Sequence, residues 1–344
     1  MAEPASPLRA LLVKVADGDA LSEAETAAAF RVLMAGEATA GQTGAFLMAL
    51  RQRGETIDEI TGAARVLRKM AVLVKAPAGA IDTCGTGGDA SGTQNISTAT
   101  ALVVAGGGVP VAKHGNRAVS SKSGSADVLE ALGVRLEANP KRVERALREA
   151  KVGFLFAPRH HQAMRHVTGV RKELGIRTIF NLLGPLANPA GAKRQLLGVY
   201  SRDWVEPMAR VLNKLGTTRA WVVHGKDGLD ELTTTTTTYV AALSKGRVRS
   251  FEVAPEDADL PRAKPGELKG GDAAANARAI ARLLEGQPGP FRNVVLLNAA
   301  AAFVIAEKAR NLKQGVTLAA DVIDTGKAQR SLAKLVEITN AGKH

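Results

Sequence analysis

The stretch with the clearest capacity for chemistry runs from Asp82 to Asp89, reads Asp-Thr-Cys-Gly-Thr-Gly-Gly-Asp, and continues into Asn95-Ile-Ser-Thr98. Glycines let a ligand approach backbone N–H groups closely, and a helix N-terminus attracts negative charge. The short apolar run Ala80 to Cys84 predicts a buried strand before the loop, and the small residues from Ser97 to Ala105 predict a helix after it. This arrangement predicts a binding site for phosphate or another anion.

Two common phosphate motifs do not fit this loop. Gly85 to Ala90 satisfies the dinucleotide pattern GxGxx(G/A), but the acidic ribose-binding residue expected ~20 positions later is missing. A Walker A loop fails because Thr93 follows Gly92 where the lysine belongs. For the glycines alone, a tight strand-to-helix turn without a ligand remains the alternative.

A second polar cluster, Lys113 to Ser125, combines cations, hydroxyls and glycines. The run Val109 to Ala112 predicts a strand before it, which completes a βαβ unit with the first strand and helix. Loops that follow parallel strands emerge at one edge of the sheet, so Gly85–Asp89 and Lys113–Asn116 should be neighbours. Taken singly, Lys113, Arg117 and Lys122 could equally belong to a solvated basic loop.

A third cluster, His224 to Glu231, follows a predicted strand at Ala220 to Val223. The adjacent carboxylates Asp230 and Glu231 are hard oxygen ligands that suit Mg²⁺. Two carboxylates opposite two anion-binding loops predict metal-bridged phosphate chemistry, whereas no segment has zinc-ligand spacing. The threonine tract 233–238 predicts an edge strand, since threonine favours strands.

The composition bounds the class of protein. With 344 residues, 45% hydrophobic and 23% charged, the chain is typical of a soluble globular protein, and its formal charge of +13 favours anionic partners. Scattered cations and only 3% aromatic residues argue against a nucleic-acid partner. One cysteine, no signal pattern and no run of ~18 apolar residues indicate a cytoplasmic protein that does not enter a membrane.

Two kinds of pattern divide the chain. Residues 1–74 show only helical periodicity, and proline and glycine in Lys75–Gly79 predict a hinge. Strands and helices then alternate, including an expected strand at Asn293 to Leu297. The predicted fold class is α/β: a small N-terminal helical domain (1–74, with a later helical insertion around 165–188) hinged to a larger α/β domain (75–164 and 189–344) with a central, mostly parallel sheet.

Taken together, the motifs resemble anthranilate phosphoribosyltransferases in order over nearly the whole chain. They are the two glycine and hydroxyl loops above, Val170-Arg-Lys-Glu-Leu-Gly175, Asn181 to Pro189 and Asp227-Gly-Leu-Asp-Glu231. The resemblance implies a nucleoside phosphorylase/phosphoribosyltransferase-like fold. It implies transfer of the phosphoribosyl group of phosphoribosyl pyrophosphate (PRPP) to the amine of anthranilate, the second step of tryptophan biosynthesis. It further implies two Mg²⁺ ions per active site and a homodimer formed through the helical domain.

The resemblance also assigns roles to positions of this sequence. It implies that Ser97, Asp230 and Glu231 bind magnesium. It implies that Gly85, Asn116 and Arg171 bind anthranilate, and that His114 and His161 are weaker candidates for lining the path of the aromatic ring. No residue is expected to be catalytic, because positioning and electrostatics should suffice without a covalent intermediate or a general base. PRPP binding falls to Gly85, Gly88, Asp89, Thr93, Asn95, Ile96, Ser97, Thr98, Lys113, His114, Gly115, Asn116, Arg117, Ala118, Val119, Ser120, Ser121 and Ser125.

Some positions depart from the family pattern. Ala90, Gln94 and Gln162 replace residues common in relatives, and the threonine tract lacks an expected Gly-Pro near its end. Two alternatives therefore stay open: a pyrimidine nucleoside phosphorylase-like enzyme, and a non-enzymatic relative that binds nucleic acid. The paired carboxylates, with Asn116 and Arg171, argue against both.

Overall fold

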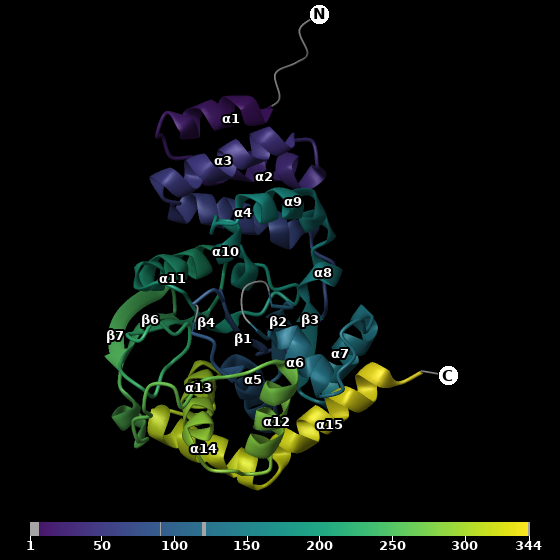
Figure 1. Cartoon of the computed structure of the whole chain (residues 1–344), viewed down its shortest axis with the longest axis vertical. Helices are drawn as coiled ribbons and strands as arrows, with labels where there is room; N and C mark the ends of the chain where they lie inside the picture. Colours follow the sequence, from purple (N-terminus) through teal and green to yellow (C-terminus); the bar gives the residue numbers. More distant parts are fainter. Residues whose placement is uncertain (1–6, 90, 119–121, 343–344) are drawn as a thin grey trace, which may run out of the picture. The chain divides into compact units, whose positions relative to one another are not determined.

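The chain forms two compact units in the computed structural model, which describes residues 7–89, 91–118 and 122–342. One unit comprises Met1–Val72 and Pro158–Ala187, and the other comprises Leu73–Ala157 and Asn188–His344. Figure 1 shows helices alone in the first unit, and a sheet with helices on both faces in the second. The predicted α/β fold class with an N-terminal helical part is confirmed. None of the helices within the described ranges is long and apolar enough to cross a membrane.

The helical unit is built from helices with strong start signals. Helices α2, α3 and α4 each begin with a capping box, in which Ser, Thr and Thr at the N-cap pair with Glu25, Gln42 and Glu59. Phe30 lies 6.4 Å from Phe46 and 5.5 Å from Phe180 between ring centroids, so the later segment shares the core of the first helices. The elements are α1 (Pro7–Ala16), α2 (Glu23–Ala35), α3 (Ala40–Arg53), α4 (Ile57–Met70), α8 (Ala157–His160), η1 (Gln162–Met164), α9 (Arg165–Leu174), α10 (Phe180–Leu183) and η2 (Gly184–Leu186).

The second unit contains a sheet whose order, in the described part of the chain, is β3-β2-β1-β4-β5-β6-β7. The pairs from β3 to β5 are parallel and the two pairs that involve β6 are antiparallel, which confirms the mostly parallel sheet. The strands are β1 (Ile81–Gly85), β2 (Val111–Gly115), β3 (Val152–Phe156), β4 (Arg194–Gly198), β5 (Arg219–Gly225), β6 (Thr238–Ser244) and β7 (Arg247–Val253).

The strand order reverses direction between β1 and β4. From β1 the chain proceeds to β2 on one side, and from β4 it proceeds to β5 on the other. Right-handed crossovers then place α5 on one face of the sheet and α11 on the opposite face, as Figure 1 shows. In open parallel sheets, ligands bind beyond the carboxyl ends of the strands at such a reversal. The remaining helices are α5 (Ile96–Gly106), α6 (Ser125–Ala131), α7 (Pro140–Glu149), η3 (Arg202–Trp204), α11 (Val205–Lys214), η4 (Pro255–Ala258), α12 (Ala273–Leu284), α13 (Pro290–Ile305), α14 (Leu312–Asp324) and α15 (Lys327–Asn340).

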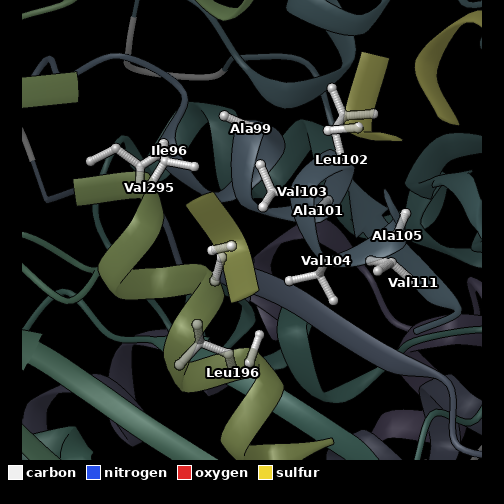
Figure 2. Close-up of a cluster of buried hydrophobic side chains, with 14 of the residues drawn as sticks. Ile96, Ala99, Ala101, Leu102, Val103, Val104, Ala105, Val111, Leu196 and Val295 are labelled. Atoms are coloured by element: carbon white, nitrogen blue, oxygen red, sulfur yellow. The ribbon is translucent and has the colours of Figure 1, made fainter. Parts of the chain in front are cut away.

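The core of this unit is centred on α5. Figure 2 shows the buried side chains of α5 in one apolar cluster with Val111 of β2, Leu196 of β4 and Val295 of α13. The strand expected at Asn293 to Leu297 is wrong, because these residues lie inside α13. A short apolar run cannot distinguish a buried strand from a buried helix, and here nearly every residue from Val294 to Ile305 is buried.

The threonine tract is also not an edge strand. Only Thr238 belongs to β6, which lies between β5 and β7, and Thr233–Thr237 have no regular structure. The hydroxyl of Thr233 donates to Asp227 at 2.6 Å, and such local hydrogen bonds compete with a strand ladder. The edge strand on this side of the sheet is β7, and its exposed charged residues leave no apolar run from which to predict it.

Candidate active site

Two glycines form the floor of the candidate site at the strand-order reversal. Gly85 ends β1, Gly198 ends β4, and the two residues are paired in register. A Cβ atom on Gly85 would overlap Oδ2 of Asp230, and a Cβ atom on Gly198 would overlap the backbone oxygen of Asp230. Glycine at both strand ends therefore lets Asp230 lie directly over the point where ligands bind in this fold. Gly198 could not be identified from the sequence, because its role becomes visible only when β1 and β4 are paired.

We expect Gly198→Ala to displace Asp230. The added methyl group has no room beside the Asp230 backbone, so the variant should lose about 1 to 3 kcal/mol of stability, as overpacked sites do. It should also need more Mg²⁺ for half-maximal activity. Thermal unfolding and a magnesium titration test this, with Gly169→Ala as a control because a Cβ there meets no atom within 4 Å. Equal behaviour of the two variants would contradict the close packing.

The glycine loop contacts the carboxylate loop directly. Gly87 and Gly88 adopt left-handed φ angles of 66° and 75°, which glycine accepts without strain. The backbone N–H of Gly87 donates to Oδ2 of Asp230 at 2.8 Å, and the N–H of Asp230 donates to Asp89 at 3.4 Å. Two predicted clusters that are far apart in the sequence are therefore adjacent.

Lys113 joins the first two clusters from inside the sheet. Its ammonium donates to the carbonyl of Thr83 at 2.6 Å and to the hydroxyl of Ser97 at 3.2 Å. β1 and β2 pair in parallel with Ile81 opposite Val111, so the carboxyl ends of the two strands lie at the same edge of the sheet, as expected. The expected strand end at Ala112 is wrong, because β2 continues to Gly115, and Lys113 and His114 are buried strand residues.

Burial perturbs the two carboxyl groups strongly. Burial and, second, the charge of Asp230 raise the pKa of Glu231 to about 8, while Lys113 and a hydrogen bond from Ser97 oppose the change. Burial likewise raises the pKa of Asp230 to about 7, with the charge of Asp89 as the second cause. The site therefore concentrates negative charge that a divalent cation would compensate.

The oxygen atoms present fit Mg²⁺. Asp230 and Glu231 supply carboxylates, and Ser97 supplies a hydroxyl that already bonds to Glu231. Over the described ranges no three His, Cys, Asp or Glu side chains converge to hold a metal ion. Such a partial ligand set suits Mg²⁺, which keeps several waters and binds substrate phosphates, better than a metal that requires a full protein cage.

The raised pKa values predict that Mg²⁺ binding releases protons. A carboxyl group must be ionised to bind the ion, so affinity should fall as the pH falls through the range of about 8 to 7 set by these groups. Calorimetry in buffers of different ionisation enthalpy should detect proton release at about pH 6 and almost none at about pH 9. An Asp230→Asn, Glu231→Gln variant is the control and should release none. Proton release that is independent of pH would contradict this assignment.

The start of α5 has no side-chain cap. Asn95 is the N-cap residue, but its side chain makes no hydrogen bond to the first turn. Instead, its amide donates to the carbonyl of Ser123 at 3.3 Å and accepts from Asn276 at 2.8 Å. Because the first N–H groups of a helix lack partners within the helix, this end of α5 suits a phosphate group.

The loop after β2 is ordered by Asp127. One of its carboxylate oxygens accepts from the N–H groups of Ala118 and Gly124, both at 2.9 Å, and the other accepts from Arg117. Arg117 also pairs with Glu130, so its guanidinium is committed within this loop. Ser125 bonds to the carbonyl of Asn116 at 3.4 Å. Val119, Ser120 and Ser121, which were predicted to bind PRPP, lie outside the described residues.

The carboxylate loop is anchored on both sides. Asp227 accepts from the hydroxyls of Thr233 and Thr235, which gives the threonine tract a structural role. Asn298 of α13 accepts from the N–H of Leu232 at 3.1 Å and donates to its carbonyl at 2.8 Å. Both contacts hold the backbone next to Glu231. The sequence analysis missed Asn298 because it lies in a helix that is otherwise apolar.

Arg171 belongs to the helical unit, on α9. Its guanidinium lies 5.0 Å from the centroid of the Phe180 ring, and burial lowers its pKa. Within the described part of the chain, no carboxylate pairs with it. Arg171 is thus a half-buried cation able to bind a ligand carboxylate.

His161 also belongs to the helical unit. Burial, and to a smaller extent the charge of His160, lower the pKa of its imidazole to about 4. This imidazole is therefore neutral at physiological pH.

Comparison with known proteins identifies the family. A family model described as "Glycosyl transferase family, a/b domain" matches residues 78–329, and one described as "Glycosyl transferase family, helical bundle domain" matches residues 9–71. An anthranilate phosphoribosyltransferase from Azospirillum brasilense is 60% identical, and the alignment covers 99% of this chain and 97% of that protein. This chain belongs to the anthranilate phosphoribosyltransferase family.

Solved structures of anthranilate phosphoribosyltransferases share the fold. The enzyme from Thermus thermophilus superposes with a TM-score of 0.91 at 47% identity, over 96% of this chain and 99% of that one. The enzyme from Saccharomyces cerevisiae, in complex with PRPP and Mg, gives 0.89 at 28% identity, over 98% and 99%. The glycine loop, the carboxylate loop and the start of α5 are therefore parts of an anthranilate phosphoribosyltransferase scaffold.

Proposed function

We propose that this chain transfers the phosphoribosyl group of PRPP to the amine of anthranilate and releases pyrophosphate. This is the second step of tryptophan biosynthesis from chorismate. The observation that carries the proposal is the position of Asp230 over Gly85 and Gly198, with Glu231 next to it in sequence. That geometry places metal-binding oxygens beside the glycine loop, at the sheet edge where ligands bind.

Mg²⁺ is the cofactor, with two ions in each active site. Asp230, Glu231 and the hydroxyl of Ser97 hold them, as hard oxygen donors whose buried negative charge requires a cation. Bound Mg²⁺ would supply positive charge to the oxygens of the departing pyrophosphate. Lys113 fixes the hydroxyl of Ser97 at 3.2 Å and adds a second positive charge nearby.

PRPP binds across the glycine loop, the start of α5 and the loop after β2. The support is the uncapped first turn of α5, the left-handed conformation of Gly87 and Gly88, and the buried ammonium of Lys113. The proposed binding residues are Gly85, Gly88, Asp89, Thr93, Asn95, Ile96, Ser97, Thr98, Lys113, His114, Gly115, Asn116, Arg117, Ala118, Val119, Ser120, Ser121 and Ser125.

Anthranilate is bound by Gly85, Asn116 and Arg171, and His114 and His161 line its path. Arg171 is supported by its half-buried guanidinium, which has no carboxylate partner among the described residues and so is available for the carboxylate of the substrate. A guanidinium can grip a carboxylate with two parallel hydrogen bonds, which a lysine ammonium cannot reproduce.

Catalysis rests on positioning and electrostatics, without a covalent intermediate or a general base. Displacement at C1 of the ribose develops negative charge on the leaving oxygens, and the start of α5 and Lys113 are preorganised to stabilise it. The chain then needs only to hold the anthranilate amine close to C1.

The protein acts as a cytoplasmic homodimer. Two large apolar side chains support pairing through the helical domain: Val13 on α1 is 53% exposed and Met48 on α3 is 37% exposed. The helical unit, Met1–Val72 with Pro158–Ala187, forms that domain, and the other unit carries the proposed PRPP and magnesium sites. Sedimentation of Val13→Asp against the wild type tests the dimer.

The activity is tested by the fluorescence of anthranilate. Purified protein with PRPP and Mg²⁺ should consume anthranilate and so remove its fluorescence, and omission of any one component should leave the signal constant. Folded protein that leaves anthranilate unchanged but cleaves uridine or thymidine with phosphate would instead support a nucleoside phosphorylase. Such a result would defeat the proposal.

A further inference from the structure

A segment that carries no recognised motif holds the second half of the glycine loop. The N–H of Gln94 donates to the carbonyl of Leu268 at 3.0 Å, and the N–H of Gly270 donates to the carbonyl of Gly92 at 2.9 Å. Thr93 and Lys269 form an isolated antiparallel bridge between these hydrogen bonds. The segment before α12 therefore pairs with the glycine loop as a short ladder.

Close packing makes glycine necessary in this ladder. A Cβ atom on Gly270 would lie 2.5 Å from the carbonyl oxygen of Thr93 and 2.7 Å from the nitrogen of Gln94. Real Cβ atoms do not approach backbone atoms so closely, so any side chain at this position would push the two segments apart. The loop from Gly92 to Gln94 is thus built to rest against this segment.

Asn276 connects the same segment to the start of α5. It lies in the first part of α12 and is 2% exposed. Its amide nitrogen donates to Oδ1 of Asn95 at 2.8 Å, and its amide oxygen accepts from the N–H of Gly271 at 2.8 Å. One end of this buried side chain therefore holds Asn95, and the other end is fixed by the backbone just before α12.

This contact determines what Asn95 leaves free. An N-cap asparagine ordinarily accepts from the N–H of the second or third helical residue, and so closes the helix start. Here Oδ1 of Asn95 accepts from Asn276 at 2.8 Å and from the hydroxyl of Ser123 at 3.4 Å, and the first turn of α5 has no side-chain cap. The N–H groups of Ile96 and Thr98 donate to backbone carbonyls, which leaves the N–H of Ser97, among the described residues, available to an anion where the proposed site places PRPP.

We propose that Asn276 is a positioning residue for PRPP binding. It touches no substrate, and it acts by holding Asn95 in a conformation that leaves the start of α5 open to phosphate. The inference rests on the proposed function for the identity of the ligand. Without Asn276, the Asn95 side chain can cap α5, and this cap must be broken before phosphate binds.

The test is PRPP binding by an Asn276→Ala variant. Calorimetry with PRPP and Mg²⁺, in the absence of anthranilate, should show a Kd raised about five- to tenfold, the equivalent of one N-cap hydrogen bond. KM for PRPP should rise by the same factor, and KM for anthranilate should stay the same. In an Asn95→Ala background, the Asn276→Ala change should have no further effect on either PRPP constant. An effect that persists in that background would overturn the inference.

Two controls separate positioning from general destabilisation. Ile280→Ala removes a fully buried side chain from the same helix without touching Asn95, and should lower thermal stability but not PRPP affinity. An equal loss of PRPP affinity in this variant would overturn the inference. If Asn276→Ala does not fold, Asn276→Ser enters the same cycle. If the wild type consumes anthranilate but the Asn276 variant keeps its PRPP affinity, this inference alone is defeated. If the wild type binds PRPP but does not consume anthranilate, the proposed function alone is defeated.

Discussion

Replacing Asp230 with Asn and Glu231 with Gln together should reduce turnover about 1,000-fold, since metal stabilisation of the leaving oxygens contributes several kcal/mol. The amides keep the size of the side chains but remove the charge that holds Mg²⁺. Steady-state rates across a magnesium titration measure this. Turnover close to the wild-type rate, with the same magnesium requirement, would remove both residues as ligands.

The same double variant should remain folded, which separates lost chemistry from lost structure. Burial raises the pKa of both carboxyl groups above their values in the unfolded chain, so the stability of the folded chain falls as the pH rises from about 4 to about 8, where both groups become ionised. The neutral amides avoid this cost. In the absence of Mg²⁺, the variant should be at least as stable as the wild type above that range, and Asp259→Asn, an exposed carboxylate paired with Lys313, is the control. A thermal midpoint well below that of the wild type at high pH would contradict the account.

Arg171→Ala should raise KM for anthranilate about 100-fold, because two hydrogen bonds to a charged carboxylate contribute about 3 kcal/mol together. PRPP binding should not change, since the proposed role of this guanidinium is limited to the aromatic substrate. Initial rates with each substrate varied in turn, and calorimetry with PRPP alone, measure the two effects separately.

Two further variants refine the test of Arg171. Lys172→Ala removes an exposed neighbouring cation from the same helix and should leave both substrates unaffected. Arg171→Lys keeps the charge but not the paired hydrogen bonds, so it should restore only part of the affinity. Equal losses of anthranilate and PRPP affinity in Arg171→Ala would contradict the assignment.

Much of the α/β unit could be predicted from local patterns. The glycine loop between an apolar run and a small-residue helix predicted β1 and α5, and the rule for parallel strands predicted that the loops after β1 and β2 would meet. The parallel pairing of β1 and β2, with Ile81 opposite Val111, confirms that both strands end at the same edge. The carboxylates Asp230 and Glu231 were likewise identified from their position after a strand.

The residues that could not be predicted owe their roles to long-range packing. Gly198 matters because Asp230 lies over it, and Asn298 because it brackets Leu232, and neither contact has a local signal. Asn276 is missed for the same reason, since its partner Asn95 is far away in the sequence. The threonine tract was misread because strand propensity ignores the carboxylate of Asp227, which accepts from its hydroxyls.

The measurement that tests the central claim most directly is the stoichiometry of pyrophosphate release against anthranilate consumption. Purified protein would be mixed with PRPP, Mg²⁺ and anthranilate, and both quantities would be followed in the same sample. We predict that one pyrophosphate appears for each anthranilate consumed, and that none appears when anthranilate is omitted. Pyrophosphate released at the same rate without anthranilate, or anthranilate left unconsumed by folded protein, would contradict the account.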